Sequence, residues 1–275
     1  NGDKEPFNVR YWGVGNESWG CGGRMLPGEY AASYRQFTAQ VPAYAQPFLV
    51  AVGPRGHSAD YDLGWTSGFF EGLQGVRGVV PDGYALHYYT DFRPTKVRAE
   101  ASNTQEYYAV LHRGAKIEEI IERHWAIMGK YDPQHRTKFV IDEWGTWYSE
   151  SRRIAPQYLL SQTITQRDAV HAAMHFDIFN RHADKTAMAN IAQTINCLHS
   201  LFTAQGDKYI RTPTYHVFAM YSGHMNGRFI PMRAAAEPFA VTLLDGSKGQ
   251  LPSISGSASL RERTLTVTLT NPSAE

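Results

Sequence analysis

The sequence predicts an α/β fold built on parallel strands. Buried-strand and helical patterns alternate five times, which is typical of parallel strands joined by right-handed crossovers. Neither a Gly-x-Gly-x-x-Gly turn nor a P-loop is present. Four of the five expected strand ends carry polar or aromatic side chains, and a barrel brings all its strand ends to one mouth. A closed (β/α)8 TIM barrel is therefore favoured over an open doubly wound sheet.

The first half of the alternation starts with a strand over 7–15 that leads to Glu17. A helix is expected from Pro27, because apolar residues then recur at steps of four and three, as on one helical face. This apolar stripe consists of Tyr30, Tyr34, Phe37, Val41 and Tyr44. A short buried strand over 48–52 follows. The next helical segment carries Trp65, Phe69, Phe70 and Leu73.

The second half repeats this order. A strand over 83–90 ends in His87, Tyr88 and Tyr89. One long helix is expected from 104 to 130, then a strand around Val140 and a helix from 156 to 182. A fifth strand over 187–192 leads into Gln193.

Thr212 and Pro213 read as an N-cap and a first-turn proline, which start a helix through Tyr221. After Gly227 the pattern changes to short strands separated by Gly, Ser, Pro and Asp. They are expected over 239–244, 251–254 and 265–269. We therefore expect a partial (β/α)8 catalytic barrel over 1–226 and a partial antiparallel β-sandwich over 227–275. Five of eight barrel units and an unfinished β module indicate a fragment of a longer protein.

The composition excludes several classes of partner. The 275 residues include 27 basic and 26 acidic ones, a net charge of +1 with no long run of either sign. Neither a nucleic acid nor a membrane surface is indicated as a partner. The sequence holds no apolar stretch of membrane-spanning length. The two cysteines, Cys21 and Cys197, are expected to be free thiols rather than a disulfide.

The stretch 138–148 contains several side chains suited to catalysis or sugar binding. Phe139 to Ile141 form a buried strand, which leads into Asp142, Glu143, Trp144 and Trp147. Burying an unpaired carboxylate is costly, so a carboxylate at such a position is either paired or used. Tryptophan faces stack on the apolar faces of sugar rings. The alternative is a capping aspartate with a salt-bridged glutamate.

A second strand end repeats the pattern, because Glu17 lies beside Trp19. In a barrel, Glu17 and Glu143 would converge on one mouth. Two facing carboxylates, one protonated and one ionised, are what glycoside hydrolysis needs. A separation of about 5–5.5 Å between them would give retention of configuration.

The motifs resemble family 51 of the glycoside hydrolases, the α-L-arabinofuranosidases, within a clan of retaining (β/α)8 barrels. The resemblance covers essentially the whole chain and rests on four motifs in order. They are Asn16-Glu17 within 11–23, Leu86-His87-Tyr88-Tyr89, Ile141-Asp142-Glu143-Trp144 and 188–193. The resemblance implies that the five expected strands are the fourth to the eighth strands of the barrel. Both ends of the family's fold would then lie outside the chain.

The resemblance also implies roles. Glu143 would be the nucleophile and Glu17 the acid/base. Asn16 would bind the sugar's 2-OH, although an asparagine can also bond its own loop. Tyr89 would donate to the carboxylate of Glu143, with His87 beside it as a substrate-binding or a structural histidine.

Other side chains receive less specific expectations. Gln193 would bind a sugar hydroxyl and Trp147 would form a wall of the pocket, whereas Trp144 is expected in the core. Asp142 is expected to give structural support, and Trp19 and Cys21 to lie near the substrate. Neither a metal nor a cofactor is expected. The pair His171 and His175, four residues apart, lacks a third ligand and reads as a helix face.

The implied reaction is exo-acting, retaining hydrolysis of terminal α-L-arabinofuranosyl residues from oligosaccharides or polysaccharides. The chain alone is expected to have little or no activity, because the first three barrel units would be missing. The family resemblance also suggests a homohexamer, and a cytoplasmic location is slightly favoured. A β-xylosidase or endo-β-glucanase of the same clan, and a non-catalytic carbohydrate-binding relic, are the alternatives.

Overall fold

A computed structural model describes residues 2, 4–5, 7–42, 44–75, 79–90, 97, 99, 103–148, 152–154 and 159–275. The chain divides into two units. Unit 1 consists of Asn1–His87 and Ile121–Ile141, and unit 2 of Tyr88–Ile120 and Asp142–Glu275. The largest sheet has the strand order β1-β2-β3-β4-β7. Its strands are β1 (Tyr11–Val14), β2 (Phe48–Ala51), β3 (Gly83–Thr90), β4 (Lys138–Thr146) and β7 (Thr186–Ile191).

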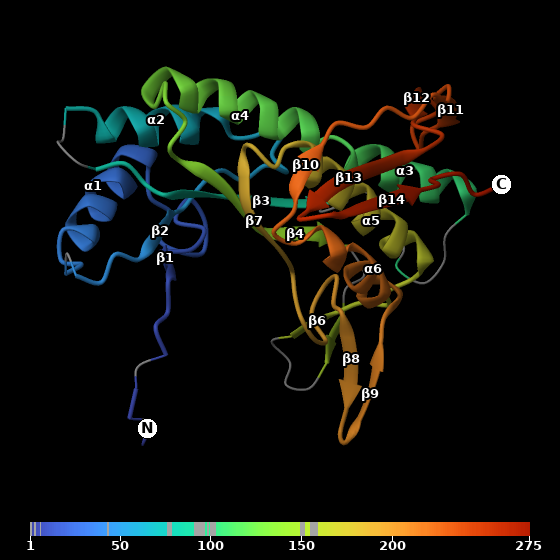
Figure 1. The fold of residues 1–275 in the computed structure, drawn as a ribbon, viewed down its shortest axis with the longest axis horizontal. Coiled ribbons are helices and arrows are strands. Elements are labelled where there is room, and N and C mark those ends of the chain that lie inside the picture. The colour runs from blue at the N-terminus through green and yellow to red at the C-terminus, as the bar shows by residue number, and fades with distance from the viewer. Residues whose placement is uncertain are drawn as a thin grey trace. The chain divides into compact units, whose positions relative to one another are not determined.

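Unit 1 begins with parallel strands and the helices between them (Figure 1). Tyr11 pairs with Phe48, and Val50 with Gly83, so β1, β2 and β3 run in parallel as expected. Helices α1 (Pro27–Thr38) and α2 (Leu63–Leu73) follow β1 and β2. Their buried aromatic side chains form much of the core of this unit. These are Tyr30, Tyr34, Trp65, Phe69 and Phe70.

One tyrosine ties this core to the strand ends. The hydroxyl of Tyr30 donates to the carbonyl of Val14 at 2.6 Å and accepts from the backbone N–H of Val52 at 2.7 Å. Both bonds satisfy backbone groups just where β1 and β2 end. Helix α1 therefore fixes the level at which the two strands open into their loops.

The expected apolar stripe of the first helix is only partly correct. Tyr30 and Tyr34 are buried, but α1 ends at Thr38, and Phe37 and Tyr44 are 65% and 89% exposed. Thr38 folds its hydroxyl back onto the carbonyl of Tyr34, a bond that competes with the helical ladder. The periodicity therefore continues in the sequence beyond the end of the helix.

Unit 2 carries α3 (Thr104–Gly114), α5 (Gln166–Arg181), α6 (Pro213–Tyr221) and the short turn η1 (Ser222–His224). Helix α4 (Ile117–Tyr131) runs from this unit into unit 1. The expected cap of α6 is confirmed, because the Thr212 side chain accepts from the N–H of Tyr215. No helix within the described ranges combines the length and the apolarity needed to cross a bilayer.

Two predicted helices have different bounds in the structure. The long helix expected over 104–130 is two helices, because α3 ends at Gly114, where an added Cβ would lie 2.7 Å from His171. The helix expected from 156 begins only at Gln166. The capping box of Thr165 and Asp168 sets that start, since each side chain satisfies a backbone N–H of the other. Residues 155–158 lie outside the described residues.

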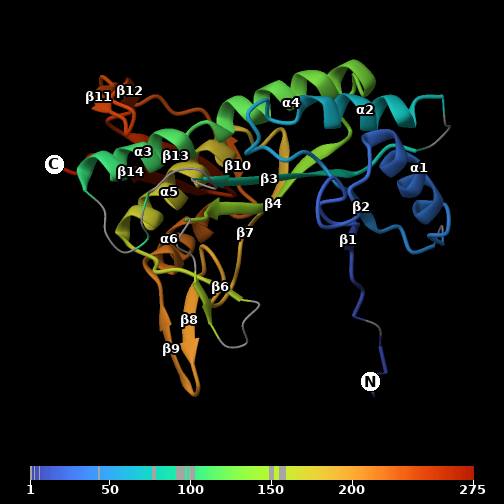
Figure 2. The ribbon, with the colours of Figure 1, turned by 180° about the vertical axis from the view of Figure 1, so that it is seen from behind.

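The antiparallel strands of unit 2 form separate small sheets. Strand β5 (Arg152–Ile154) pairs antiparallel with β6 (Leu159–Ser161), and β8 (Phe202–Gln205) with β9 (Lys208–Arg211). One further sheet has the order β10-β13-β14, and another pairs β11 with β12. Their bounds are β10 (Arg228–Ile230), β11 (Phe239–Thr242), β12 (Lys248–Leu251), β13 (Ser255–Arg261) and β14 (Thr264–Thr270). Helix α5 packs against β13 and β14 (Figures 1 and 2).

The sequence missed several of these strands. Strand β13 contains Ser-Gly-Ser-Ala-Ser, which lacks the β-branched and aromatic residues that mark a strand. The strand expected over 251–254 is instead β12, which ends at Leu251. A buried carboxylate stabilises this region, because Asp177 of α5 accepts from the hydroxyls of Tyr221, Ser257 and Thr270. These bonds join α6 and the β10-β13-β14 sheet to α5.

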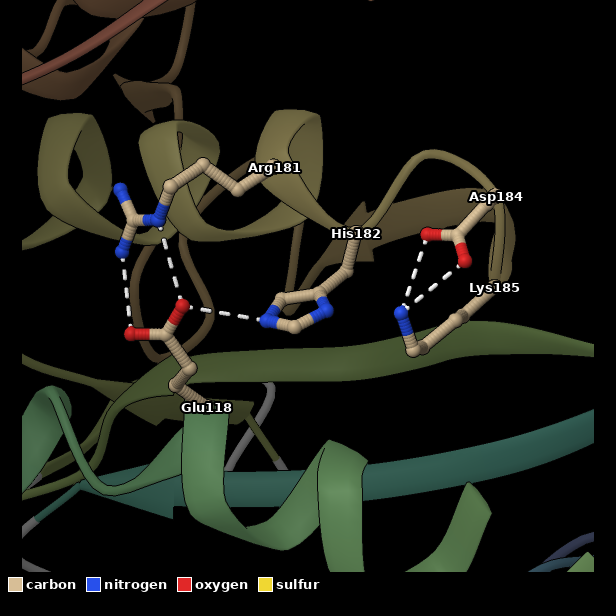
Figure 3. Close-up of polar contacts among 5 residues, drawn as sticks. All are labelled: Glu118, Arg181, His182, Asp184 and Lys185. Atoms are coloured by element: carbon tan, nitrogen blue, oxygen red, sulfur yellow. Dashed lines mark hydrogen bonds and ion pairs between the residues drawn. The ribbon is translucent and has the colours of Figure 1, made fainter. Parts of the chain in front are cut away.

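An ion-pair cluster joins the start of α4 to the end of α5 within unit 2 (Figure 3). Arg181 donates to both oxygens of Glu118, at 3.2 and 3.0 Å, and Nε2 of His182 lies 3.0 Å from the same carboxylate. Burial alone would raise the pKa of Glu118, but His182 and Arg181 lower it to about 2. Figure 3 also shows the pair of Lys185, which is partly buried, and Asp184, which is exposed. Nζ of Lys185 lies 3.0 Å from Oδ2 of Asp184.

Candidate functional site

Glu17 follows β1 on a tight turn of unit 1. Its backbone carbonyl accepts from the N–H groups of Gly20 and Gly22, at 2.7 and 3.0 Å. Its own φ is +43°, a left-handed value that is strained for a residue with a side chain. The loop closes so tightly that a Cβ on Gly22 would lie 1.7 Å from the carbonyl oxygen of Asn16. This turn therefore fixes the direction in which Glu17 leaves the strand end.

Both carboxyl oxygens of Glu17 have hydrogen-bond partners. Nδ1 of His87, on β3, lies 2.9 Å from Oε1, and the thiol of Cys21 donates to Oε2 at 3.3 Å. The side chain of Glu17 is 20% exposed and that of His87 only 5%. The carboxyl is thus held from two sides and still reaches solvent. The resemblance had placed His87 beside Tyr89, and its contact with Glu17 was not anticipated.

Aromatic and basic groups surround this carboxyl. Trp19 meets the ring of His87 edge-on at 6.4 Å and the ring of His57 at 6.5 Å. Arg55 places its guanidinium 5.3 Å from the Trp19 ring centroid. The sequence analysis overlooked Arg55 and His57. The sequence could have indicated these two residues, because both follow the end of β2 just as Glu17 follows the end of β1.

The surroundings favour the ionised form of Glu17. Burial by itself would raise its pKa, but the hydrogen bond and charge of His87, with smaller contributions from Cys21 and His57, bring the pKa below its ordinary value. Burial lowers the pKa of His57 to about 4, and Arg55 adds to the effect, so His57 is neutral near pH 7. Glu17 is therefore a carboxylate in the free chain, whereas an acid catalyst must carry a proton.

Glu143 belongs to unit 2 and lies inside β4, which continues to Thr146. The strand was expected to stop at Ile141, so Asp142 and Glu143 are strand residues rather than loop residues. The hydroxyl of Tyr89, at the end of β3, donates to Oε2 of Glu143 at 2.8 Å. This bond is the one that the resemblance implied for Tyr89.

An apolar cluster surrounds Tyr89. The Trp147 ring lies edge-on to the Tyr89 ring, with centroids 5.1 Å apart. Trp147 is partly buried and Tyr89 is 4% exposed. The buried members of the cluster are Tyr89, Ala192, Cys197 and Leu198. Glu143 is thus bonded by a phenol that apolar side chains hold in place.

Other expected side chains fall into two groups. Asn16 and Gln193 are exposed in the loops after β1 and β7, so each is accessible to a ligand. Trp144 is fully buried, as expected, against the rings of Phe176 and Phe218, and Asp142 is partly buried. Neither cysteine is in a disulfide, and Cys21 is exposed while Cys197 is buried.

The histidines of α5 are structural. His171 and His175 are buried with their rings 4.0 Å apart. Thr90 Oγ1 lies 2.8 Å from Nε2 of His171, and the carbonyl of Gly114 lies 3.0 Å from Nε2 of His175. A third buried ring, that of His199, accepts from the N–H of Thr146 through Nδ1. The contacts of His171 and His199 thus lie at the ends of β3 and β4, and the contact of His175 lies at the end of α3.

Comparisons with known proteins agree on one family. Residues 142–274 match the Alpha-L-arabinofuranosidase C-terminal domain. The intracellular exo-alpha-L-arabinofuranosidase of Bacteroides ovatus is 34% identical over the whole chain, which covers 52% of that protein. The intracellular exo-alpha-(1->5)-L-arabinofuranosidase of Streptomyces lividans is 24% identical over 85% of the chain, which covers 35% of that protein.

Solved structures give the same result. The GH51 arabinofuranosidase of Xanthomonas axonopodis pv. citri superposes with a TM-score of 0.88 and 35% identity. The match covers 100% of this chain and 54% of that one. The chain therefore spans about half the length of the Bacteroides ovatus and Xanthomonas axonopodis relatives and about a third of the Streptomyces lividans one. Over the matched half of the Xanthomonas axonopodis structure it shares a mixed α/β fold, with a parallel sheet and separate antiparallel sheets.

Proposed function

Because the chain belongs to the family 51 arabinofuranosidases, we propose that the protein carrying it removes terminal α-L-arabinofuranosyl residues from arabinose-containing oligosaccharides or polysaccharides. The proposed reaction is exo-acting and retains configuration. One observation carries it. β3 supplies both His87, which bonds Glu17, and Tyr89, which bonds Glu143. Residues two apart on a strand point to the same face, so His87 and Tyr89 leave β3 on one side.

In the proposed mechanism Glu143 is the nucleophile. Its carboxylate attacks the anomeric carbon, and an arabinosyl–enzyme ester forms while the leaving oxygen takes a proton from Glu17. The Tyr89 hydroxyl favours the ionised form of Glu143 and fixes its direction of attack. In the second step Glu17 removes a proton from water, which then hydrolyses the ester.

The second step needs Glu17 in its ionised form, which the surroundings favour in the free chain. The first step needs a proton on the same carboxyl. A bound sugar would cover the exposed part of Glu17 and exclude water, and desolvation disfavours the charged form. We infer that substrate binding raises the pKa of Glu17 and prepares the acid. Asn16 would bind the 2-OH, Gln193 another hydroxyl, and Trp147 an apolar sugar face.

The finer architecture is part of the same proposal. The strands β1, β2, β3, β4 and β7 would be strands four to eight of a (β/α)8 barrel over 1–226, and 227–275 part of a β-sandwich. The relatives from Bacteroides ovatus and Streptomyces lividans are named intracellular, which supports a cytoplasmic location. Assembly into a homohexamer stays a prediction.

A substrate panel tests the proposal. The protein carrying this chain, at its natural length, should hydrolyse 4-nitrophenyl α-L-arabinofuranoside and release free arabinose from the ends of arabino-oligosaccharides. The aryl xyloside and a soluble glucan serve as the comparison for the β-xylosidase and endo-β-glucanase alternatives. Faster turnover of either one would overturn the assignment, as would sugar binding without any turnover.

A further inference from the structure

The second oxygen of Glu17 has a partner that the proposed mechanism does not use. Cys21 lies four residues after Glu17, and its thiol donates to Oε2 at 3.3 Å. The thiol is exposed and is not in a disulfide. His87 bonds the other oxygen, so the two side chains hold the carboxyl from opposite ends.

The backbone fixes the thiol in this place. Two hydrogen bonds to the Glu17 carbonyl, from Gly20 and Gly22, close the turn on either side of Cys21. The turn continues with bonds from Arg24 to Gly20 and from Met25 to Ser18, at 3.0 and 2.7 Å. Because a Cβ at Gly22 would collide with Asn16, the chain can follow this course only with glycine there. The contact between Cys21 and Glu17 is therefore built into the turn.

A thiol has chemistry that suits a carboxyl which must gain and lose a proton. Its S–H is a weak donor and its sulfur a weak acceptor, whereas a hydroxyl in the same place would be a stronger donor. A strong donor would hold the carboxyl in its ionised form and oppose its protonation. A weak donor such as a thiol orients the carboxylate and opposes its protonation only slightly.

We propose that Cys21 is a positioning residue for Glu17, whose thiol orients the second carboxyl oxygen while leaving the group free to take up and release a proton. The proposal rests on the proposed function, because it assigns Cys21 to the acid/base step. Within unit 1, the titratable and charged groups around this carboxyl are His87 of β3, and His57 and Arg55 of the loop after β2. Cys21 is the neighbour whose donor strength a single-atom change can alter.

The contact itself is tested without turnover. Alkylation by iodoacetamide needs the thiolate, which the nearby carboxylate disfavours by repulsion between like charges. In the folded chain, Glu17→Gln should speed alkylation of Cys21 about threefold to tenfold at pH 7.5. Peptide mass spectrometry locates the label, and the buried Cys197 is the internal control. Glu71→Gln, an exposed carboxylate on α2, should change nothing. Equal rates in wild type and Glu17→Gln would overturn the contact.

The role is tested by the pH profile of kcat/KM, whose basic limb reports loss of the acid's proton. Cys21→Ser, a stronger donor, should move that limb to lower pH, and Cys21→Ala should move it to higher pH. A uniform loss of activity with an unmoved limb in both variants would overturn the positioning role. Lack of arabinofuranoside hydrolysis by the wild type would overturn the proposed function instead, and the alkylation result would still decide whether the contact exists.

Discussion

The two carboxyl groups of the candidate site are held in different ways. Glu17 sits on a strained turn between a histidine and a thiol, and it is partly exposed. Glu143 sits within a strand and accepts from a tyrosine that an apolar cluster holds in place. Histidine and thiol groups titrate or exchange hydrogen-bond roles near neutral pH, whereas a phenol keeps its proton. The partners thus fit the proposed roles of an acid/base for Glu17 and a nucleophile for Glu143.

The largest expected effects come from removing one carboxyl or the other, because the two variants should fail in different steps. Glu143→Ala should lower turnover of an aryl arabinofuranoside by about 10⁴-fold or more, because no ester can form. Glu17→Ala should retain the first step with a good leaving group, and added azide should restore turnover by replacing the water that needs a base. Product release with and without azide measures both. Azide rescue of Glu143→Ala with inverted product, and no rescue of Glu17→Ala, would mean that the roles are exchanged.

A smaller effect is expected at the phenol. Tyr89→Phe removes the bond to Glu143, and hydrogen bonds to charged groups contribute about 1.5–3 kcal/mol. We expect kcat/KM to fall about 10- to 100-fold with an unchanged fold. Tyr88→Phe is the matched control on the same strand, since its hydroxyl donates to the carbonyl of Arg113. The Tyr88 variant should lose stability and keep its activity; equal losses of activity in both would show a purely structural role for Tyr89.

Replacing His87, the histidine beside Glu17, should change the pH dependence of the reaction as well as its rate. His87 lowers the pKa of Glu17 by its hydrogen bond and charge, so His87→Phe should raise that pKa and move the basic limb of kcat/KM to higher pH. His57→Phe should move it less, because His57 is neutral near pH 7, with a pKa of about 4. A basic limb that stays in place in His87→Phe would contradict the assignment of Glu17 as the acid.

The smallest expected effect concerns the buried histidines His175 and His199, which should make the stability of the chain depend on pH. Burial lowers the pKa of His175 to about 3 and that of His199 to about 4. Below about pH 6.5 the unfolded chain binds protons that the folded chain does not, so the free energy of unfolding should fall as pH drops from 6.5 towards 4.

Urea unfolding at pH 7.5 and pH 5 measures this loss. His175→Phe should show a weaker pH dependence, whatever its absolute stability. His216→Gln, which changes an exposed histidine, should retain the pH dependence of the wild type. An unchanged slope in His175→Phe would contradict the linkage. Near the buried rings lie two charged groups, Asp168 and Arg167, which act on His199 in opposite directions.

The sequence by itself determined the features that depend on local pattern. Runs of β-branched and aromatic residues marked the parallel strands, and Thr212 with Pro213 marked the start of α6. The motifs around Glu17, Tyr89 and Glu143 identified the family and the hydrogen bond between the last two. These signals are local because strand burial, helix capping and motif spacing are properties of neighbouring residues.

Only the tertiary structure decided which partners meet. His87 and Glu17 are 70 residues apart, and their contact depends on the register of parallel strands rather than on any nearby residue. The same holds for Gly114 at the end of α3, which lies close against His171 of another helix, and for β13, whose small residues become a strand through pairing with β14. Long-range packing supplied this information, because hydrogen bonds and close contacts between distant segments exist only once the chain has folded.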